Sequence, residues 1–138
     1  MKISSIMTEK VITVDMDITL AAICGIFEDN KFHHLLVVED GELRGVISDR
    51  DILKALSPFL NTPGEQARDL TTLRKRAHQV MRRKPITITK DASAKDAVRL
   101  MFQKNISCLP VMSSDGQIQG IVTRKDLLDV YSQQLAAV

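Results

Sequence analysis

Hydrophobic residues along the chain follow two patterns, one typical of strands and one typical of helices. Short runs rich in β-branched residues indicate strands, and they lie at Val11 to Val14, Leu35 to Val38, Leu43 to Ser48, Ile86 to Thr89, Leu109 to Met112 and Ile118 to Thr123. After the first run of each half, apolar residues recur at the spacing of one helix face. They are Leu20, Ile23, Cys24 and Phe27 in the first half and Ala94, Ala97, Val98, Met101 and Phe102 in the second.

The two halves of the chain repeat one another. Shifting the sequence by 74 residues pairs Met7 with Met81 and Leu35 with Leu109, and one insertion near Ser113 raises the offset to 75. The repeat then brings GVISDRDIL at residues 45–53 onto GIVTRKDLL at residues 120–128. A repeated unit must be identified before the fold is assigned, because it defines the architecture.

Each copy closes with a predicted helix that begins at a hydroxyl, Ser48 in the first copy and Thr123 in the second. The full order is therefore β-α-β-β-α, twice, which predicts a mixed α/β fold of the α+β type. In both motifs an acid, Asp51 or Asp126, follows the hydroxyl by three residues. That spacing is typical of a capping box, which any helix can use, so the motif by itself leaves a purely structural interpretation open.

Turn-forming residues separate the copies. Ser57-Pro58 and Asn61 to Gly64 interrupt the helical pattern. We therefore predict a first repeat at residues 1–57, a linker at 58–79 and a second repeat at 80–138. From Glu65 onward apolar residues return at helical spacing, which predicts one amphipathic linker helix with its cations on the outer face. Its apolar residues are Leu70, Leu73, Ala77 and Val80.

Composition is that of an ordinary globular protein. The 138 residues are 44% hydrophobic and 26% charged. A chain of this length can bury a core without disulfides or a structural metal. The longest weakly polar run, Ile18 to Phe27, is too short to span a membrane, and the N-terminus has no signal-peptide pattern. Cys24 and Cys108 lack the spacing of a zinc site. We expect a cytoplasmic protein with reduced, buried cysteines, no metal site and no membrane association, and we interpret the six methionines as core residues.

Charge is distributed unevenly. Residues 1–57 carry 6 Lys/Arg and 10 Asp/Glu, a net of −4, and residues 58–138 carry 13 and 7, a net of +6, which together give +2. Arg68 to Lys84 holds seven basic residues and one acid, a candidate nucleic-acid footprint. The chain has only 4% aromatic residues and no Trp to stack on bases. We keep nucleic-acid binding through this stretch as an alternative function.

The doubled β-α-β-β-α unit with its two Gly-x-x-[Ser/Thr]-x-x-Asp motifs resembles the cystathionine β-synthase (CBS) domain family. The second copy also has the family's Leu-Pro-Val strand at Leu109 to Val111, whereas the first has Leu35 to Val37. The resemblance covers Ile3 to Tyr131. It implies two repeats packed through their sheets with pseudo-twofold symmetry, the pair called a Bateman module.

The resemblance also implies a function. CBS pairs bind adenosine compounds such as AMP, ADP, ATP or S-adenosylmethionine in clefts between the repeats, regulate an attached or partner protein, and commonly form homodimers. We expect such a regulatory module here, without a required cofactor and without catalysis, because no nucleophile with a base and no paired carboxylates occur. An S-adenosylmethionine sensor and an architectural dimer with empty clefts are further alternatives.

The family motif assigns candidate ligand residues. Ribose or phosphate would contact Ser48, Asp51, Thr123 and Asp126, and a carboxylate has the lone pairs to accept both hydroxyls of a cis-diol. The candidates for adenine are Val11, Ile12, Thr13, Leu36, Val37, Val38, Pro85, Ile86, Thr87, Pro110, Val111 and Met112. The candidates for phosphate are Arg50, Arg124, Lys125, His33 and His34. Because Arg124-Lys125 replaces the Asp49-Arg50 of the first motif, we expect a triphosphate to suit the second site better.

Overall fold

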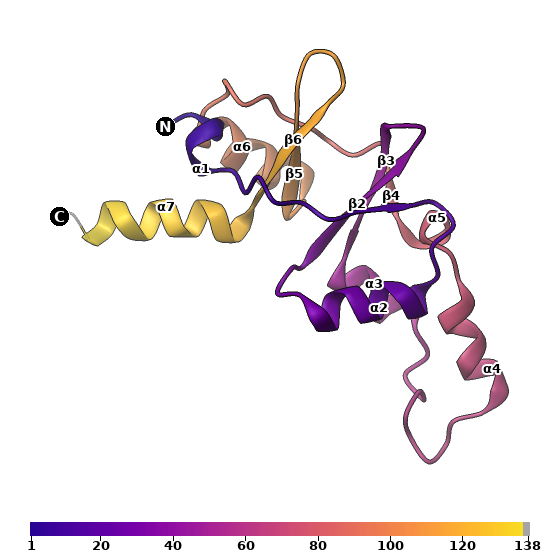
Figure 1. Ribbon diagram of the computed structural model, residues 1–138. Coiled ribbons are helices and arrows are strands. Elements are labelled where there is room, and N and C mark those ends of the chain that lie inside the picture. Colours follow the sequence, from indigo (N-terminus) through magenta and orange to yellow (C-terminus); the bar gives the residue numbers. More distant parts are fainter. Residues whose placement is uncertain (137–138) are drawn as a thin grey trace. The chain divides into compact units, whose positions relative to one another are not determined.

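The computed structural model describes residues 1–136 and has two compact units (Figure 1). We call residues 12–84 the first unit, and residues 1–11 together with 85–138 the second unit. The units therefore do not coincide with the sequence copies, because the two copies exchange segments. The first eleven residues pack with the second copy, and the chain just before the second copy packs with the first.

The first unit is a four-stranded sheet covered by helices. Its strands are β1 (Thr13–Asp15), β2 (His34–Glu39), β3 (Glu42–Ser48) and β4 (Arg82–Arg83), in the order β1-β2-β3-β4. Strands β1 and β2 are parallel, and the other pairs are antiparallel. Its two longer helices are α2 (Leu20–Asp29), which begins at the Thr19 cap, and α3 (Asp49–Ala55). Alternate β2 residues Leu35 and Val37 pack with Leu20, Ile23 and Ile47 in the core.

The second unit repeats this plan with a smaller sheet. It consists of α1 (Ile3–Ile6), α6 (Ala94–Lys104), β5 (Cys108–Met112), β6 (Ile118–Thr123) and α7 (Arg124–Ala136). Leu109, Val111 and Val122 form its core with Ile3 and Ala97. The expected strand at Ile86 to Thr89 is reduced to one parallel bridge, Ile88 to Val111.

The recurring glycine of the two motifs lies against the exchanged segment. A Cβ at Gly45 would lie 2.6 Å from Met81 Sδ, and a Cβ at Gly120 would lie 2.7 Å from the carbonyl oxygen of Thr8 and 3.1 Å from Met7 Sδ. Met7 and Met81 occupy equivalent positions of the repeat. Glycine recurs because the segment at Met81 lies directly against the strand of Gly45, and the segment at Met7 and Thr8 lies directly against the strand of Gly120.

The predicted single linker helix is wrong. Residues 67–80 form three short pieces, α4 (Ala67–Leu70), a 3-10 turn η1 (Thr71–Arg74) and α5 (Ala77–Val80). The chain is extended at Arg76, where the backbone of Leu20 bonds to the carbonyl of Lys75. Tertiary contacts therefore override the helical spacing, and Leu70, which we expected to face inward, is 48% exposed.

Two other core assignments also need correction. In α6 the buried residues are Ala97 and Met101, whereas Phe102 is 85% exposed and Val98 is exposed. Met81 and Met101 are core residues as expected, but Met1 is exposed. Among residues 1–136, no helix is long and apolar enough to cross a membrane.

Candidate functional site

Asp51 of the first motif caps helix α3. The Ser48 hydroxyl accepts a hydrogen bond from the backbone N–H of Asp51 (3.1 Å), and the backbone N–H of Ser48 donates to Asp51 Oδ2 (2.9 Å). The capping box expected from the sequence is therefore present, and it uses one of the two carboxylate oxygens.

Asp126 of the second motif has the same arrangement at the start of α7. The backbone N–H of Thr123 donates to Asp126 Oδ2 (2.9 Å), and the Thr123 hydroxyl lies 3.3 Å from the backbone nitrogen of Asp126, which donates to it. The two motifs thus share one local geometry, in which Oδ2 is committed to the helix and Oδ1 points elsewhere.

The second oxygen of each carboxylate contacts the exchanged segment. Arg82 Nε lies 3.4 Å from Asp51 Oδ1, and the Thr8 hydroxyl donates to Asp126 Oδ1 at 2.9 Å. Thr8 and Arg82 are 74 residues apart and therefore equivalent in the repeat. Sequence reasoning missed both residues. The repeat offset was the available signal, but it shows equivalence and not contact.

The adenine candidates of the first unit lie on adjacent strands. Thr13 pairs with Leu36, and the Leu36 N–H donates to the carbonyl of Ile12 (3.0 Å). The Val37 side chain points into the core with no exposed surface. Leu36 is also buried but belongs to the opposite face of the strand. The Val37 side chain is therefore not available to a ligand.

The second unit places its adenine candidates in the same way. Ile88 N–H donates to the carbonyl of Pro110 (3.0 Å), and Met112 N–H donates to the carbonyl of Ile88 (2.9 Å). These bonds hold the segment from Pro85 beside β5. Val111 lies in the core, and Pro110 is buried on the other face of its strand.

The phosphate candidates differ in whether they already contact another side chain. His33 Nδ1 lies 2.9 Å from Asp49 Oδ2, and both side chains are partly exposed. Arg50, Arg124 and Lys125 are exposed. His34 begins β2. Within residues 1–136, no three His, Cys, Asp or Glu side chains are grouped to hold a metal ion.

Neither cysteine forms a disulfide. Cys108 is buried and Cys24 is half-buried. Burial, together with the neighbouring Glu28 carboxylate, raises the pKa of the Cys24 thiol. A raised pKa disfavours the reactive thiolate, as expected for a structural cysteine.

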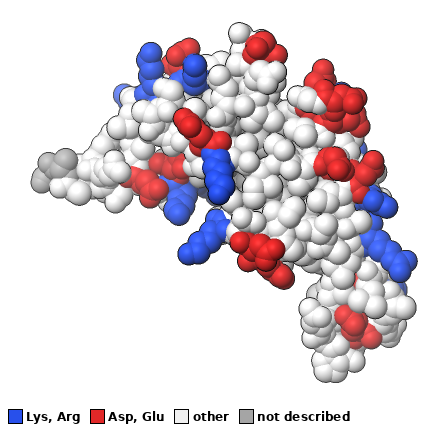
Figure 2. Space-filling model, in the orientation of Figure 1, with Lys and Arg blue, Asp and Glu red and all other residues white. Residues whose placement is uncertain are grey.

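The basic stretch does not form one free cationic face. Lys75 Nζ donates to the carbonyl of Ala55 (2.9 Å), Arg76 Nη1 to that of Asp17 (2.6 Å), and Arg83 Nη2 to that of His78 (2.9 Å). Lys and Arg side chains are interspersed with Asp and Glu on the face shown in Figure 2. Much of the stretch therefore has a structural role within the first unit, which weighs against the nucleic-acid footprint.

Comparisons with known proteins agree with this architecture. The family model of the CBS domain matches residues 3–58 and 77–133. A CBS domain-containing protein of Dictyostelium discoideum is 35% identical over 138 residues, which are 99% of this chain and 94% of that protein. The chain spans only 40% and 43% of two further relatives, both uncharacterized proteins of Methanocaldococcus jannaschii.

Solved structures with ligands are also similar. A CBS domain pair in complex with methylthioadenosine and S-adenosyl-L-methionine has a TM-score of 0.81 and 25% identity, with 97% of this chain and 98% of that chain covered. The structure of CBSX2 in complex with AMP has a TM-score of 0.76 and 25% identity, with 96% of both chains covered. The cytosolic domain of the Mg²⁺ channel MgtE with ATP has a TM-score of 0.68 and 26% identity over 90% of this chain and 46% of that chain. The repeat, the two units and these matches identify the chain as a member of the CBS domain family, with two CBS repeats.

Proposed function

We propose that the protein is a regulatory module that senses adenine nucleotides, AMP, ADP or ATP, and that it is not an enzyme. The observation that carries the proposal is the carboxylate that recurs in both motifs. Its Oδ2 is held by the helix cap, and its Oδ1 contacts a side chain, Arg82 or Thr8, that a ligand could replace. Ribose hydroxyls are suitable replacements for that partner, because a charged acceptor strengthens their hydrogen bonds.

The similar structures support adenosine compounds as the ligand class. They are complexes with AMP, with ATP, and with S-adenosylmethionine and methylthioadenosine, all of which contain adenosine. We infer that Asp51 and Asp126 each receive a ribose, with Ser48 and Thr123 beside it. The adenine would contact the β1–β2 backbone in the first unit and the equivalent segments in the second. S-adenosylmethionine remains the alternative ligand.

A sensing module also needs an output, and we propose a homodimer. Leu53 and Leu128 occupy equivalent positions of the repeat and are 73% and 67% exposed. On α7, Leu128, Tyr131 and Leu135 form an exposed apolar side at helical spacing. A second copy would remove this surface from water. We also propose a cytoplasmic location, which is supported by the lack of a disulfide at Cys24 and Cys108.

Thermal denaturation with AMP, ADP, ATP and S-adenosylmethionine tests the proposal. A ligand at 100 times its dissociation constant stabilises the folded state by about 2.7 kcal/mol. We expect one or more of these ligands to raise the melting temperature of the wild type but not of the Asp51→Asn/Asp126→Asn double variant. Absence of any shift in the wild type would favour the architectural alternative.

A further inference from the structure

The two candidate sites differ in the side chain that holds the second oxygen of the carboxylate. In the first unit it is the guanidinium of Arg82, and in the second unit it is the neutral hydroxyl of Thr8. Because the residues are equivalent in the repeat, the structure offers a natural comparison of one position with and without a positive charge.

The Arg82 contact is weak enough to be exchanged. It is a single contact of 3.4 Å through Nε rather than a bidentate pair, and 57% of the Arg82 side chain is exposed. A single long contact from a largely exposed guanidinium is weaker than a bidentate pair. Within residues 1–136, the Nη groups of Arg82 make no hydrogen bond. They are available to an anion.

The backbone of Arg82 is nevertheless well placed. It lies on β4, where it pairs with Val46 of β3, and Asp51 is only 10% exposed. The guanidinium is therefore held beside a nearly buried carboxylate while its tip stays in solvent. Arginine is well suited to phosphate in this position, since its N–H donors match two phosphate oxygens at once.

We propose that Arg82 makes the first site selective for phosphorylated adenosines, whereas the Thr8 site accepts uncharged ones. This inference rests on the proposed function. A phosphate would take the guanidinium from Asp51 and leave Oδ1 to the ribose. An uncharged nucleoside would have to displace Arg82 with nothing to replace the lost ion pair. At Asp126 a ribose hydroxyl simply replaces the Thr8 hydroxyl.

The inference reverses the expectation from the motif residues alone. Arg124 and Lys125 indicated the second site as the one for a triphosphate. They are exposed side chains, and no contact in the structure ties them to Asp126. Arg82, which lies outside the motif, is the cation that actually contacts a motif carboxylate.

Calorimetric titration of the full chain with AMP and with adenosine tests the selectivity. The Asp126→Asn background removes the ribose acceptor of the second site but keeps an oxygen for the helix cap. In that background we expect Arg82→Thr to weaken AMP binding by about tenfold or more, the usual effect of losing a charge-assisted hydrogen bond. Adenosine binding should stay unchanged or become tighter, because Asp51 is released.

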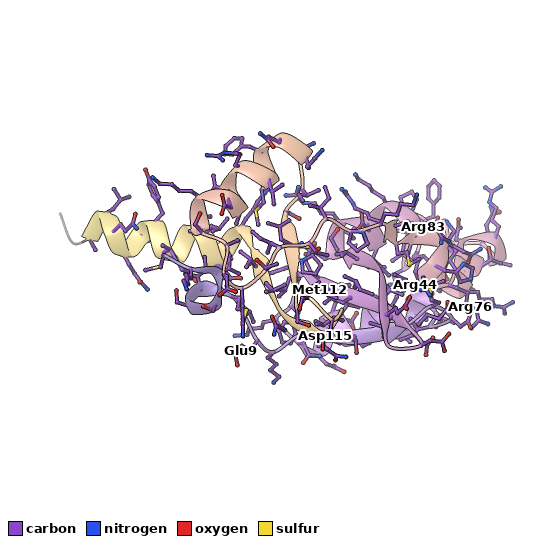
Figure 3. The ribbon with its side chains drawn as sticks, turned by 90° about the horizontal axis from the view of Figure 1, so that it is seen from above. Glu9, Arg44, Arg76, Arg83, Met112 and Asp115 are labelled. Atoms are coloured by element: carbon purple, nitrogen blue, oxygen red, sulfur yellow. The ribbon has the colours of Figure 1, made fainter. Side chains whose placement is uncertain are left out.

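Arg83→Thr is the matched control. Arg83, labelled in Figure 3, is the next residue on β4. Its side chain therefore lies on the opposite face of the strand from Arg82, and its Nη2 donates to the carbonyl of His78. Its replacement removes the same formal charge, and we expect little change in AMP binding. Equal losses in the Arg82 and Arg83 variants would reduce the effect to general electrostatics and overturn the inference.

The opposite substitution, Thr8→Arg, tests the same inference if the Arg82→Thr variant folds poorly. In the Asp51→Asn background, Thr8→Arg should raise the preference of the second site for AMP over adenosine by about tenfold. Equal changes for both ligands would contradict the role of this position, although the proposed function would stand. If the wild type bound neither ligand, this inference would fail, and titration with ADP and ATP would decide whether the proposed function stands.

Discussion

The Thr8 hydroxyl donates to Asp126 Oδ1 at 2.9 Å, across 118 residues of sequence. This bond connects the N-terminal segment to the first turn of α7. It is supported by two backbone hydrogen bonds between Thr8 and Ile121, of 2.8 Å and 2.9 Å. The segment is therefore an integral part of the second unit, and changes at Thr8 should affect its stability as well as its ligand.

Thr8→Val removes this hydroxyl and keeps the shape of the side chain. A hydrogen bond to a charged group contributes about 1.5–3 kcal/mol, and we expect a loss at the lower end because Asp126 is only partly buried. Urea denaturation measures it. Thr87→Val, at an exposed threonine without a side-chain hydrogen bond in the structure, is the control. Equal effects of both substitutions would mean that the Asp126 bond contributes nothing.

The capping and binding roles of Asp51 can be separated by two substitutions. Asp51→Ala removes the cap acceptor and should cost about 1 kcal/mol of stability. Asp51→Asn keeps one acceptor oxygen for the Ser48 N–H, so most of the stability should remain while ribose binding is lost. Denaturation and nucleotide titration of both variants provide the comparison.

Asp96 is the control for this separation. It forms the same capping box with Ser93 at the start of α6, but it lies outside the Gly-x-x-[Ser/Thr]-x-x-Asp motifs. Asp96→Ala should lower stability without changing ligand affinity. If Asp51→Asn bound nucleotide as tightly as the wild type, the motif would be a cap alone.

Gly45→Ala and Gly120→Ala should both destabilise the fold. At Gly45 the nearest atoms to the new methyl group would belong to the flexible Met81 side chain, with the carbonyl oxygen of Arg82 at 3.0 Å. At Gly120 the nearest atom would be the rigid carbonyl oxygen of Thr8, at 2.7 Å. We therefore expect a cost of about 1–3 kcal/mol at Gly45 and a larger one at Gly120. Met81→Ala should partly rescue Gly45→Ala in a double-variant cycle.

Gly25→Ala should have the opposite effect and stabilise the fold. Gly25 lies within α2, and a Cβ there would meet nothing within 4 Å. Alanine is favoured over glycine in a helix by about 1 kcal/mol, so this variant should be more stable than the wild type. Thermal denaturation of all three variants would reveal the ranking, and a similar cost at all three glycines would contradict it.

Asp69 should make the stability of the linker pH-dependent. Its carboxylate accepts from the Gln66 N–H (2.7 Å) and the Ser57 hydroxyl (2.8 Å), and these bonds hold its pKa below the usual range. Its contribution is then complete above the unfolded-state pKa of about 3.9 and is lost as the pH falls toward the folded-state pKa. Between pH 6 and pH 3, Asp69→Asn should lose less stability than the wild type in urea denaturation. Parallel curves would contradict this role.

The exposed apolar side of α7 gives a test of the homodimer. Leu128→Glu would place a charge where a second copy is proposed to pack, so sedimentation equilibrium should change from a dimer to a monomer of 15.4 kDa. Leu70→Glu, at an exposed leucine of the linker, should leave the mass unchanged. A monomeric wild type would refute the proposed dimer.

Much of the local structure followed from spacing. The strand at Ile118–Thr123, the cap at Ser93 and the helix starts after Ser48 and Thr123 agree with the sequence-based predictions. These features depend on neighbouring residues, whose periodicity and capping chemistry can be read directly. The linker helix was predicted wrongly because backbone bonds from distant residues extend the chain at Arg76.

The sequence by itself determined the repeat, the CBS family and the two carboxylates that became the candidate site. Only the tertiary structure decided which segment packs with which copy, why Gly45 and Gly120 recur, and that Arg82 and Thr8 are the second partners of Asp51 and Asp126. The physical reason is the distance along the chain. A cap is formed within four residues, whereas these contacts depend on how separated segments come together when the two units fold.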